Sequence, residues 1–274
     1  MSFIGTNLVR AQGFTPPGPG DFDLPPIGPD TTFEFLGQSM YAGVTKPMLQ
    51  LVFSAVVLFL FFRVASAKRA MVPGRMQFAG EGMYGFVRNS MGRDIIGSRD
   101  FMRFVPYLFA LFFFILLNNV FASIPLIQFP TFSRAGMVYG LALLSWVIYN
   151  VVGIAKHGFL GYLKLQCVPA GISGAMLLLL VPLEFMSNII VRPVTLALRL
   201  FANMLAGHLL LILFALGGEY LLLEASVLVK PVGLLAWALF IAIAFLELLV
   251  QLLQAYVFVL LNAMYISGAL ADEH

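Results

Sequence analysis

The fold of this chain is decided by its longest apolar tract, which reads PVGLLAWALFIAIAFLELLVQLLQAYVFVLLNAMYISG over residues 231–268. The whole tract covers 225–268, and a second tract of similar length covers 175–216. As a helix, about forty residues extend about 60 Å, which is twice the ~30 Å hydrocarbon core of a bilayer. Each tract therefore either folds back or crosses the membrane at a steep tilt. Only Arg192-Pro193, in the first tract, offers a break, so we expect two long and steeply tilted transmembrane helices.

The composition of the whole chain also belongs to a lipid environment. Of 274 residues, 61% are hydrophobic and 11% are charged, whereas soluble domains are about 25% charged. A spanning segment must satisfy its backbone hydrogen bonds internally, and no ten-residue barrel alternation is visible, so the fold class is all-α. The net charge of +3 and the lack of a basic patch among aromatics argue against a nucleic-acid partner. The single cysteine, Cys167, has no second cysteine for a disulfide or a metal site.

The rest of the sequence divides into a tail and three shorter apolar segments. Residues 1–39 are rich in proline and glycine, and we expect a flexible N-terminal tail. Residues 40–274 form a single transmembrane domain. Besides the two long helices, its expected elements are a span at 48–62, a membrane-surface helix within 73–103, and two spans at 104–124 and 137–155. The sequence thus predicts an all-α integral membrane protein with about five transmembrane helices and one membrane-surface helix.

The basic residues indicate how the chain is oriented. Of the 16 lysines and arginines, ten lie on one side of the expected membrane, four on the other, and two within it. Cytoplasmic loops carry the excess of positive charge, so we expect the N-terminus outside and the C-terminus in the cytoplasm. The ten are Arg63, Lys68, Arg69, Arg75, Arg88, Arg93, Arg99, Arg103, Lys156 and Lys164.

Polar side chains form one stripe on the first long helix. Their spacings of 4, 4, 3, 4 and 4 residues keep them on one face at about 100° per residue. Charges that face lipid cost several kcal/mol, so this stripe must face protein or water. A structural alternative is a salt bridge between Glu184 and Arg192, whereas Arg199 has no carboxylate at i±3 or i±4. The stripe consists of Glu184, Asn188, Arg192, Thr195, Arg199 and Asn203.

The second long helix carries its own polar line, formed by Glu247, Gln251 and Gln254. Such residues can be satisfied core groups, but three of them within eight residues of a membrane helix favour a functional role. If the two helices pack antiparallel with Asn203 beside Gln254, counting along both helices brings His208 next to Glu247. His208 itself lies about 180° around its helix from Arg199.

Three motifs resemble the family of the F-type ATP synthase subunit a. They are LALRLFANMLAGHLLL at 196–211, VQLLQAYVFVLLNAMYISGAL at 250–270 and NNVFASIP at 118–125. The resemblance implies that Arg199 is the family's essential arginine, facing a ring of c subunits. Ala122 stands where some bacterial members have an acidic residue.

The resemblance also assigns the proton path. It implies that Asn203 and Gln254 line it, that His208 and Glu247 form an acid–base pair, and that Glu184 is the carboxylate of the inner side. We add Gln251 to this path because it belongs to the polar line of the second long helix. Glu184 lies one residue farther from Pro193 than the family pattern.

The function implied by this resemblance is a non-catalytic, proton-translocating stator subunit with two aqueous half-channels. Its partners would be the c ring, the peripheral-stalk b subunits and the remaining ATP synthase subunits, with no cofactor and no metal. No GxxxxGK[ST] phosphate loop is present, in keeping with a chain that binds no nucleotide. We expect a multi-pass protein of the bacterial plasma membrane, with the mitochondrial inner membrane as the alternative. A self-contained ion transporter or channel is the alternative function, although the internal repeats typical of transporters are not evident.

Overall fold

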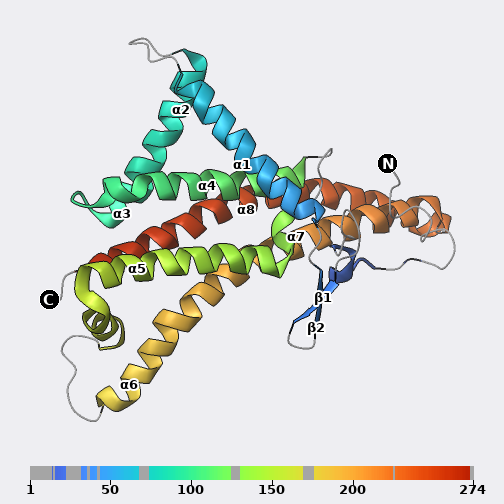
Figure 1. Ribbon diagram of the computed structural model, residues 1–274. Coiled ribbons are helices and arrows are strands. Elements are labelled where there is room, and N and C mark those ends of the chain that lie inside the picture. The colour runs from blue at the N-terminus through green and yellow to red at the C-terminus, as the bar shows by residue number, and fades with distance from the viewer. Residues whose placement is uncertain are drawn as a thin grey trace.

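The computed structural model describes residues 14, 16–22, 32–35, 38–41, 44–67, 74–124, 130–168, 176–224 and 226–271. Five helices in these ranges are long and apolar enough to cross a membrane, which confirms the all-α membrane fold class. Figure 1 shows α8 (Lys230–Leu270) between α4 (Phe101–Ser123) and α5 (Ala135–Cys167), while the first span leans away from them. The five spans are Lys46–Ala65, Phe101–Ser123, Ala135–Cys167, Met176–Leu223 and Val227–Leu270.

The first span, α1 (Lys46–Ala65), begins at a proline and ends near a basic residue, as its sequence favours. It is followed by α2 (Arg75–Phe86), by the π-helix η2 (Val87–Arg93) and by the short α3 (Asp94–Ile96). This stretch lies within the expected surface segment and is not among the five spans. Gly97 ends α3 with a φ of 92°, a conformation that favours glycine. In Figure 1, α1 and α2 form a V that projects from the bundle.

The hairpin of α4 (Phe101–Ser123) and α5 (Ala135–Cys167) agrees with the two expected spans, except at the end of α5. The sequence predicted an end near residue 155, but the helical chain continues past a kink at Gly158, where φ is 73°. After the kink the chain turns back, and the ring of Tyr162 occupies the space that a side chain at Gly153 would fill. The last turns of α5 therefore lie beside the rest of the helix.

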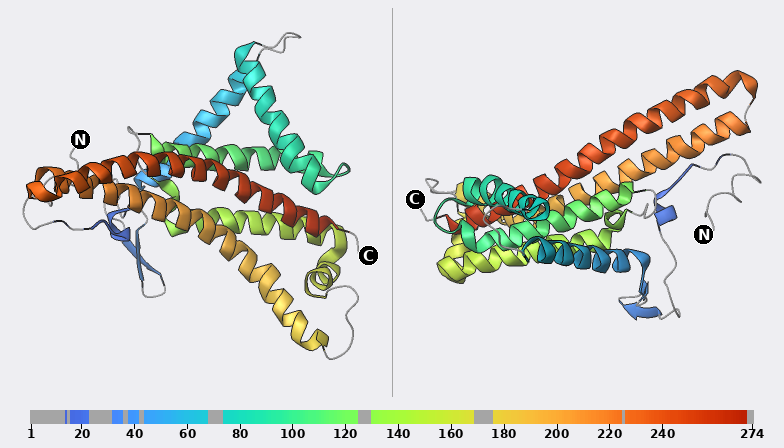
Figure 2. Two further views of the ribbon diagram at one scale, coloured as in Figure 1. Left: turned by 180° about the vertical axis from the view of Figure 1, so that it is seen from behind. Right: turned by 90° about the horizontal axis from the view of Figure 1, so that it is seen from above.

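The first long tract does not fold back at Arg192-Pro193. Instead α6 (Met176–Phe185), the π-helix η4 (Met186–Val191) and α7 (Arg192–Leu223) follow without interruption. The short 3-10 helix η5 (Val227–Val229) leads into α8 (Lys230–Leu270). Figure 2 shows α7 and α8 running antiparallel, inclined to α4 and α5, and extending beyond them. The expectation of two long helices that do not fold back is confirmed, and their steep tilt in the membrane stays a prediction.

The core lies where α4, α5, α7 and α8 meet. Small residues occupy several of its positions, which lets helix backbones approach closely, as is usual in membrane bundles. These buried small residues are Ala122, Ala142, Ala197, Ala255, Ala263 and Ala269. Larger buried side chains, such as Leu200 and Phe258, fill the space between them. The packed helices hold the polar residues of α7 and α8 at fixed positions.

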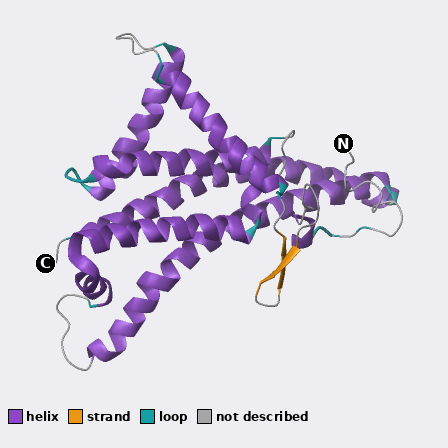
Figure 3. Cartoon of the chain, in the orientation of Figure 1, coloured by secondary structure: helices purple, strands orange, loops and turns teal. Residues whose placement is uncertain are grey.

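Part of the N-terminal tail has regular structure, which the sequence did not lead us to expect. The strands β1 (Thr32–Phe35) and β2 (Gln38–Tyr41) pair antiparallel, with Phe33 opposite Met40 (Figure 3). The 3-10 helix η1 (Pro19–Phe22) precedes them. Residues 1–13 and 23–31 lie outside the described part of the chain, so the flexible tail stays a prediction.

Candidate functional site

Arg199 lies on α7 with its side chain exposed, between the buried residues Leu196 and Leu200 on neighbouring positions of the helix. Within the described ranges it has neither a carboxylate within ion-pairing distance nor a hydrogen bond. A charge on a membrane-spanning helix is costly unless protein or water faces it. The geometry therefore places an unpaired, fixed positive charge on the outer surface of this chain, where a second protein could meet it.

One turn farther along α7, Asn203 connects this surface to α8. Its Nδ2 donates a hydrogen bond of 2.7 Å to Oε1 of Gln254, which is buried. The sequence-based register of the two helices assumed that Asn203 lies beside Gln254, and this contact is confirmed. The two long helices therefore have the register that the sequence predicted.

His208 and Glu247 meet as that register requires. Nδ1 of His208 lies 3.2 Å from Oε1 of Glu247, and only 8% and 6% of these two residues are exposed. The same Oε1 accepts a hydrogen bond of 3.2 Å from Gln251. Oε2 of Glu247 is buried without a partner among the described residues. The predicted contact is confirmed, and it leaves one carboxylate oxygen available for a proton or a water molecule.

Helix α4 contributes two residues that sequence reasoning did not assign to the site. Ser123 donates to Oε1 of Gln251 at 2.9 Å, and Asn119 donates to the backbone carbonyl of the same residue at 3.0 Å. Both belong to the NNVFASIP motif, which was the available signal. A cavity of about 10 Å³ lies between Asn119, Asn203, Glu247 and the two glutamines, about the size that holds one water molecule.

Gly207 is the reason that Glu247 can approach α7 so closely. A Cβ at this position would lie 3.2 Å from Cδ and 3.3 Å from Cγ of Glu247. Any larger side chain would have to displace the carboxyl group. The glycine next to His208 thus makes room for its partner.

The tail covers this pair from the other side. The ring of Phe22, which is 5% exposed, lies on His208 with 6.2 Å between centroids, and Phe14 lies 5.8 Å from Tyr220 on the same helix. An open cavity of about 480 Å³ lies beside Phe22 and is also lined by Arg134 and Phe201. Nothing in a proline- and glycine-rich tail indicated this contact, beyond the presence of isolated aromatic residues.

The part of the stripe that precedes Arg199 has different partners. Asn188 donates to Oε2 of Glu184 at 3.1 Å and to the backbone carbonyl of Gln166 on α5 at 2.6 Å. Arg192 lies 3.5 Å from Oε1 of Gln166 and stacks over the ring of Tyr265, 5.2 Å from its centroid. The structural alternative, a salt bridge between Glu184 and Arg192, does not occur in this described segment.

The π-helix η4 changes the register of this stripe. In a regular α-helix, Glu184 would lie about 80° around the axis from Arg192, because eight residues rotate by about 800°. A π turn holds one extra residue, which subtracts about 100° and leaves an offset of about 20°. Arg199 lies a further 20° in the same direction, so Glu184 is about 40° from Arg199 with the bulge and would be about 60° from it, on the other side, in a regular helix. The bulge therefore accommodates the extra residue before Pro193 and brings Glu184 close to the line of Arg192.

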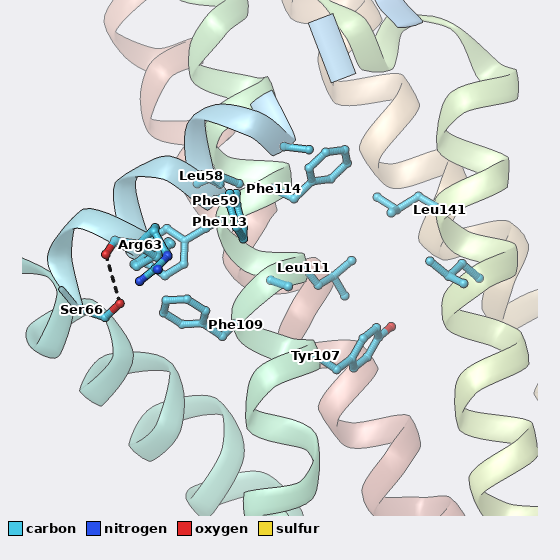
Figure 4. Close-up of a pocket in the computed structure, with 14 residues that line it drawn as sticks. Leu58, Phe59, Arg63, Ser66, Tyr107, Phe109, Leu111, Phe113, Phe114 and Leu141 are labelled. Carbon is cyan, nitrogen blue, oxygen red and sulfur yellow. Dashed lines mark hydrogen bonds between the residues drawn. The ribbon is translucent and has the colours of Figure 1, made fainter. Parts of the chain in front are cut away.

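An open apolar recess lies away from all these residues. It has a volume of about 640 Å³ and lies among α1, α4 and α5. Figure 4 shows Arg63 and Ser66 at one end, Leu141 at the other, and phenylalanines between them. Its apolar lining offers no path for protons. No group of three histidine, cysteine, aspartate or glutamate side chains that could hold a metal ion is found over the described ranges.

Comparisons with known proteins agree with this arrangement. The family model described as "ATP synthase A chain" matches residues 48–267. A protein of Nocardioides sp. named "ATP synthase subunit a" is 76% identical over the full length of both chains. A protein of the same name from Pseudarthrobacter chlorophenolicus is 49% identical over 95% of each chain. Another, from Rhodococcus erythropolis, is 41% identical over 99% of this chain and 96% of its own length.

Proposed function

The chain belongs to the ATP synthase A chain family, and from that premise we propose that it is the proton-conducting stator subunit of a bacterial ATP synthase. It is a non-catalytic subunit of that complex and couples the proton gradient to ATP synthesis. Each proton that crosses contributes about 2.3 kcal/mol per 100 mV, and several must be combined to make one ATP.

The observation that carries this proposal is the exposed Arg199 on a membrane-spanning helix, which has no ion-pair partner among the residues that the structure describes. Arginine is not deprotonated in proteins, so this residue is not a proton carrier but a fixed charge. Facing a ring of c subunits, it favours the ionised form of each passing ring carboxylate. It also blocks protons from passing directly between the two access paths, so that protons cross only as the ring rotates.

The outer half-channel is lined by the polar residues that join α7 to α8. His208 and Glu247 form a buried hydrogen-bonded pair through which a proton can pass, and Gln251 holds the carboxylate in place. Asn203 and Gln254 continue this line toward Arg199. A water molecule in the 10 Å³ cavity would connect the Glu247 carboxylate to Asn203 and Gln254.

The inner half-channel follows the stripe from Glu184 through Asn188 toward Arg199. Glu184 is half-buried and accepts a hydrogen bond from Asn188, so a water-filled path on that side would have a carboxylate at its entrance. The excess of basic residues on this side favours a cytoplasmic location for this end. The partners of the chain are then the c ring, the peripheral-stalk b subunits and the other subunits of the complex in the bacterial plasma membrane.

The substitution Arg199→Ala tests the proposal, with Arg63→Ala on α1 as a control. We expect Arg199→Ala to assemble with the c ring but to lose proton-driven ATP synthesis, because no neutral side chain supplies a fixed charge. Arg63 lines the apolar recess and lies outside both proposed half-channels, so its variant should retain coupled synthesis. Both are measured in membrane vesicles, with assembly checked by co-purification of the c ring and the soluble ATPase sector. Coupled synthesis by an assembled Arg199→Ala complex would refute the proposal. Absence of c subunits from the purified wild-type protein would favour a self-contained transporter.

A further inference from the structure

Phe14 and the 3-10 helix η1 lie against α7 at two separate points. The ring of Phe22, the last residue of η1, lies on His208 with 6.2 Å between centroids, and Phe14 lies 5.8 Å from Tyr220. Twelve residues of helix, or about 18 Å, separate His208 from Tyr220, so the tail is held along α7 rather than at a single site. The matched family model begins at residue 48, so these contacts come from a part of the chain outside it.

The open cavity of about 480 Å³ lies among η1, the start of α5 and α7. Helix η1 contributes Phe22 to its wall, and α7 contributes Phe201 and Leu205. His208 lies within about 60° of both residues around the axis of α7, on the face opposite Arg199. The rest of the lining consists of Pro19, Ser133, Arg134, Ala135, Gly136 and Met137.

The Phe22 ring stands between this cavity and His208. Phe22 lines the cavity and contacts the imidazole, whereas His208 is not among the described residues that line the cavity. Phe22 is 5% exposed and His208 is 8% exposed, so each ring is covered on most of its surface. A phenylalanine side chain has no polar group, so it cannot relay a proton from the cavity to the imidazole.

His208 has one ring nitrogen in use and one without a partner among the described residues. Nδ1 lies 3.2 Å from Oε1 of Glu247, while Nε2 makes no hydrogen bond within the described ranges. An imidazole passes a proton on by accepting it at one nitrogen and releasing it from the other. A proton that leaves Nδ1 for Glu247 is therefore replaced at Nε2, and this replacement requires a water molecule.

We propose that this cavity is the outer mouth of the proton path and that Phe22 is the gate between the mouth and His208. The inference rests on the proposed function, in which His208 and Glu247 line the outer half-channel. With the ring in place, Phe22 separates the imidazole from the water of the cavity. When the ring turns aside, or when η1 lifts from α7, water from the cavity brings a proton to Nε2.

The substitution Phe22→Ala tests the gate, with Phe14→Ala as the matched control. Both variants remove an aromatic contact between the tail and α7, but only Phe22 contacts His208 and lines the cavity. If Phe22 merely anchors the tail, the two variants should behave alike. If it is a gate, only Phe22→Ala should change the access to His208.

Access is measured as the rate at which diethyl pyrocarbonate modifies His208 in the purified complex, read by mass spectrometry. His157 serves as the internal reference, because it lies near the opposite end of the bundle, on α5. Loss of the ring removes its burial from the closed state, so we expect His208 to react about tenfold faster in Phe22→Ala. Passive proton flux in vesicles stripped of the soluble ATPase sector should also rise. Both values should stay at those of the wild type in Phe14→Ala.

A tether between η1 and α7 provides a second test if Phe22→Ala fails to assemble. Pro19→Cys and Leu205→Cys, both at the cavity, are joined by a short reducible cross-linker in a Cys167→Ser background. The tether leaves Phe22 in place and holds η1 on α7, so proton flux should fall and should recover when the linker is reduced.

Four outcomes overturn the inference. They are unchanged reactivity of His208 in Phe22→Ala, unchanged flux in that variant, an equal rise of both values in Phe14→Ala, and flux that the tether does not lower. Modification of His208 requires no ATP synthesis, so its result is separate from that of Arg199→Ala.

Discussion

Exchange of the two members of the buried pair tests the outer half-channel. His208 and Glu247 come from different helices, and their atoms Nδ1 and Oε1 are 3.2 Å apart. In His208→Leu or Glu247→Leu, one polar group remains buried without its partner. In the double variant His208→Glu with Glu247→His, the two groups can meet again across the same gap.

The size of the effect follows from the burial of the pair. An unsatisfied buried polar group costs about 1–3 kcal/mol. If that cost adds to the barrier for proton transfer, each leucine variant slows proton flux by about 5- to 150-fold. The exchange should recover part of this loss, but not all, because Gln251 and Ser123 are arranged around a carboxylate on α8.

Passive proton flux is measured in vesicles from which the soluble ATPase sector has been stripped, with co-purification of the c ring as the test of assembly. Glu219→Leu serves as a control, because it removes an exposed carboxylate from α7 and should leave the flux unchanged. If the exchange is no better than the worse leucine variant in an assembled complex, the two residues do not act as a pair.

Three further outcomes are expected. Gly207→Ala should lower passive proton flux by less than the leucine variants do, because a methyl group there displaces the Glu247 carboxyl by only a few tenths of an ångström; unchanged flux would contradict this. Phe22→Ala should make the tail more sensitive to a protease added from outside, since burial of a phenylalanine contributes about 1.5–3 kcal/mol; an unchanged cleavage rate would argue against the docked tail. In intact cells, a cysteine at Ser2 should be labelled from outside and one at Asp272 only from inside, and labelling of both from one side would refute the orientation.

Regular helices made the central contacts predictable. Asn203–Gln254 and His208–Glu247 follow from two numbers, the rise and the rotation per residue, once the helices are taken as antiparallel. Neither number depends on side-chain detail, so sequence spacing was sufficient. The same holds for the presence of the five spans, which apolar length alone indicates.

The features that departed from expectation are those that regular geometry does not determine. The π turn at η4 is not recorded in the residue spacing, and the indole that donates to its Ile189 carbonyl lies on another helix. The place of Asn119 in the site depends on which helix packs beside α8. The contact of Phe22 with His208 joins residues far apart in the chain, and no local pattern records such a contact.

The docked tail also carries information about biogenesis. Phe22 rests on a side chain of α7, whereas the ribosome delivers the tail to the membrane before any of the spans. Until α7 has been inserted, the surface that buries this ring does not exist. Closure of the tail over His208 is therefore a late event in maturation. Phe22 is buried only when α7 is in place, long after the N-terminal segment has been synthesised. The time at which this segment becomes protected from proteases therefore marks the completion of the bundle.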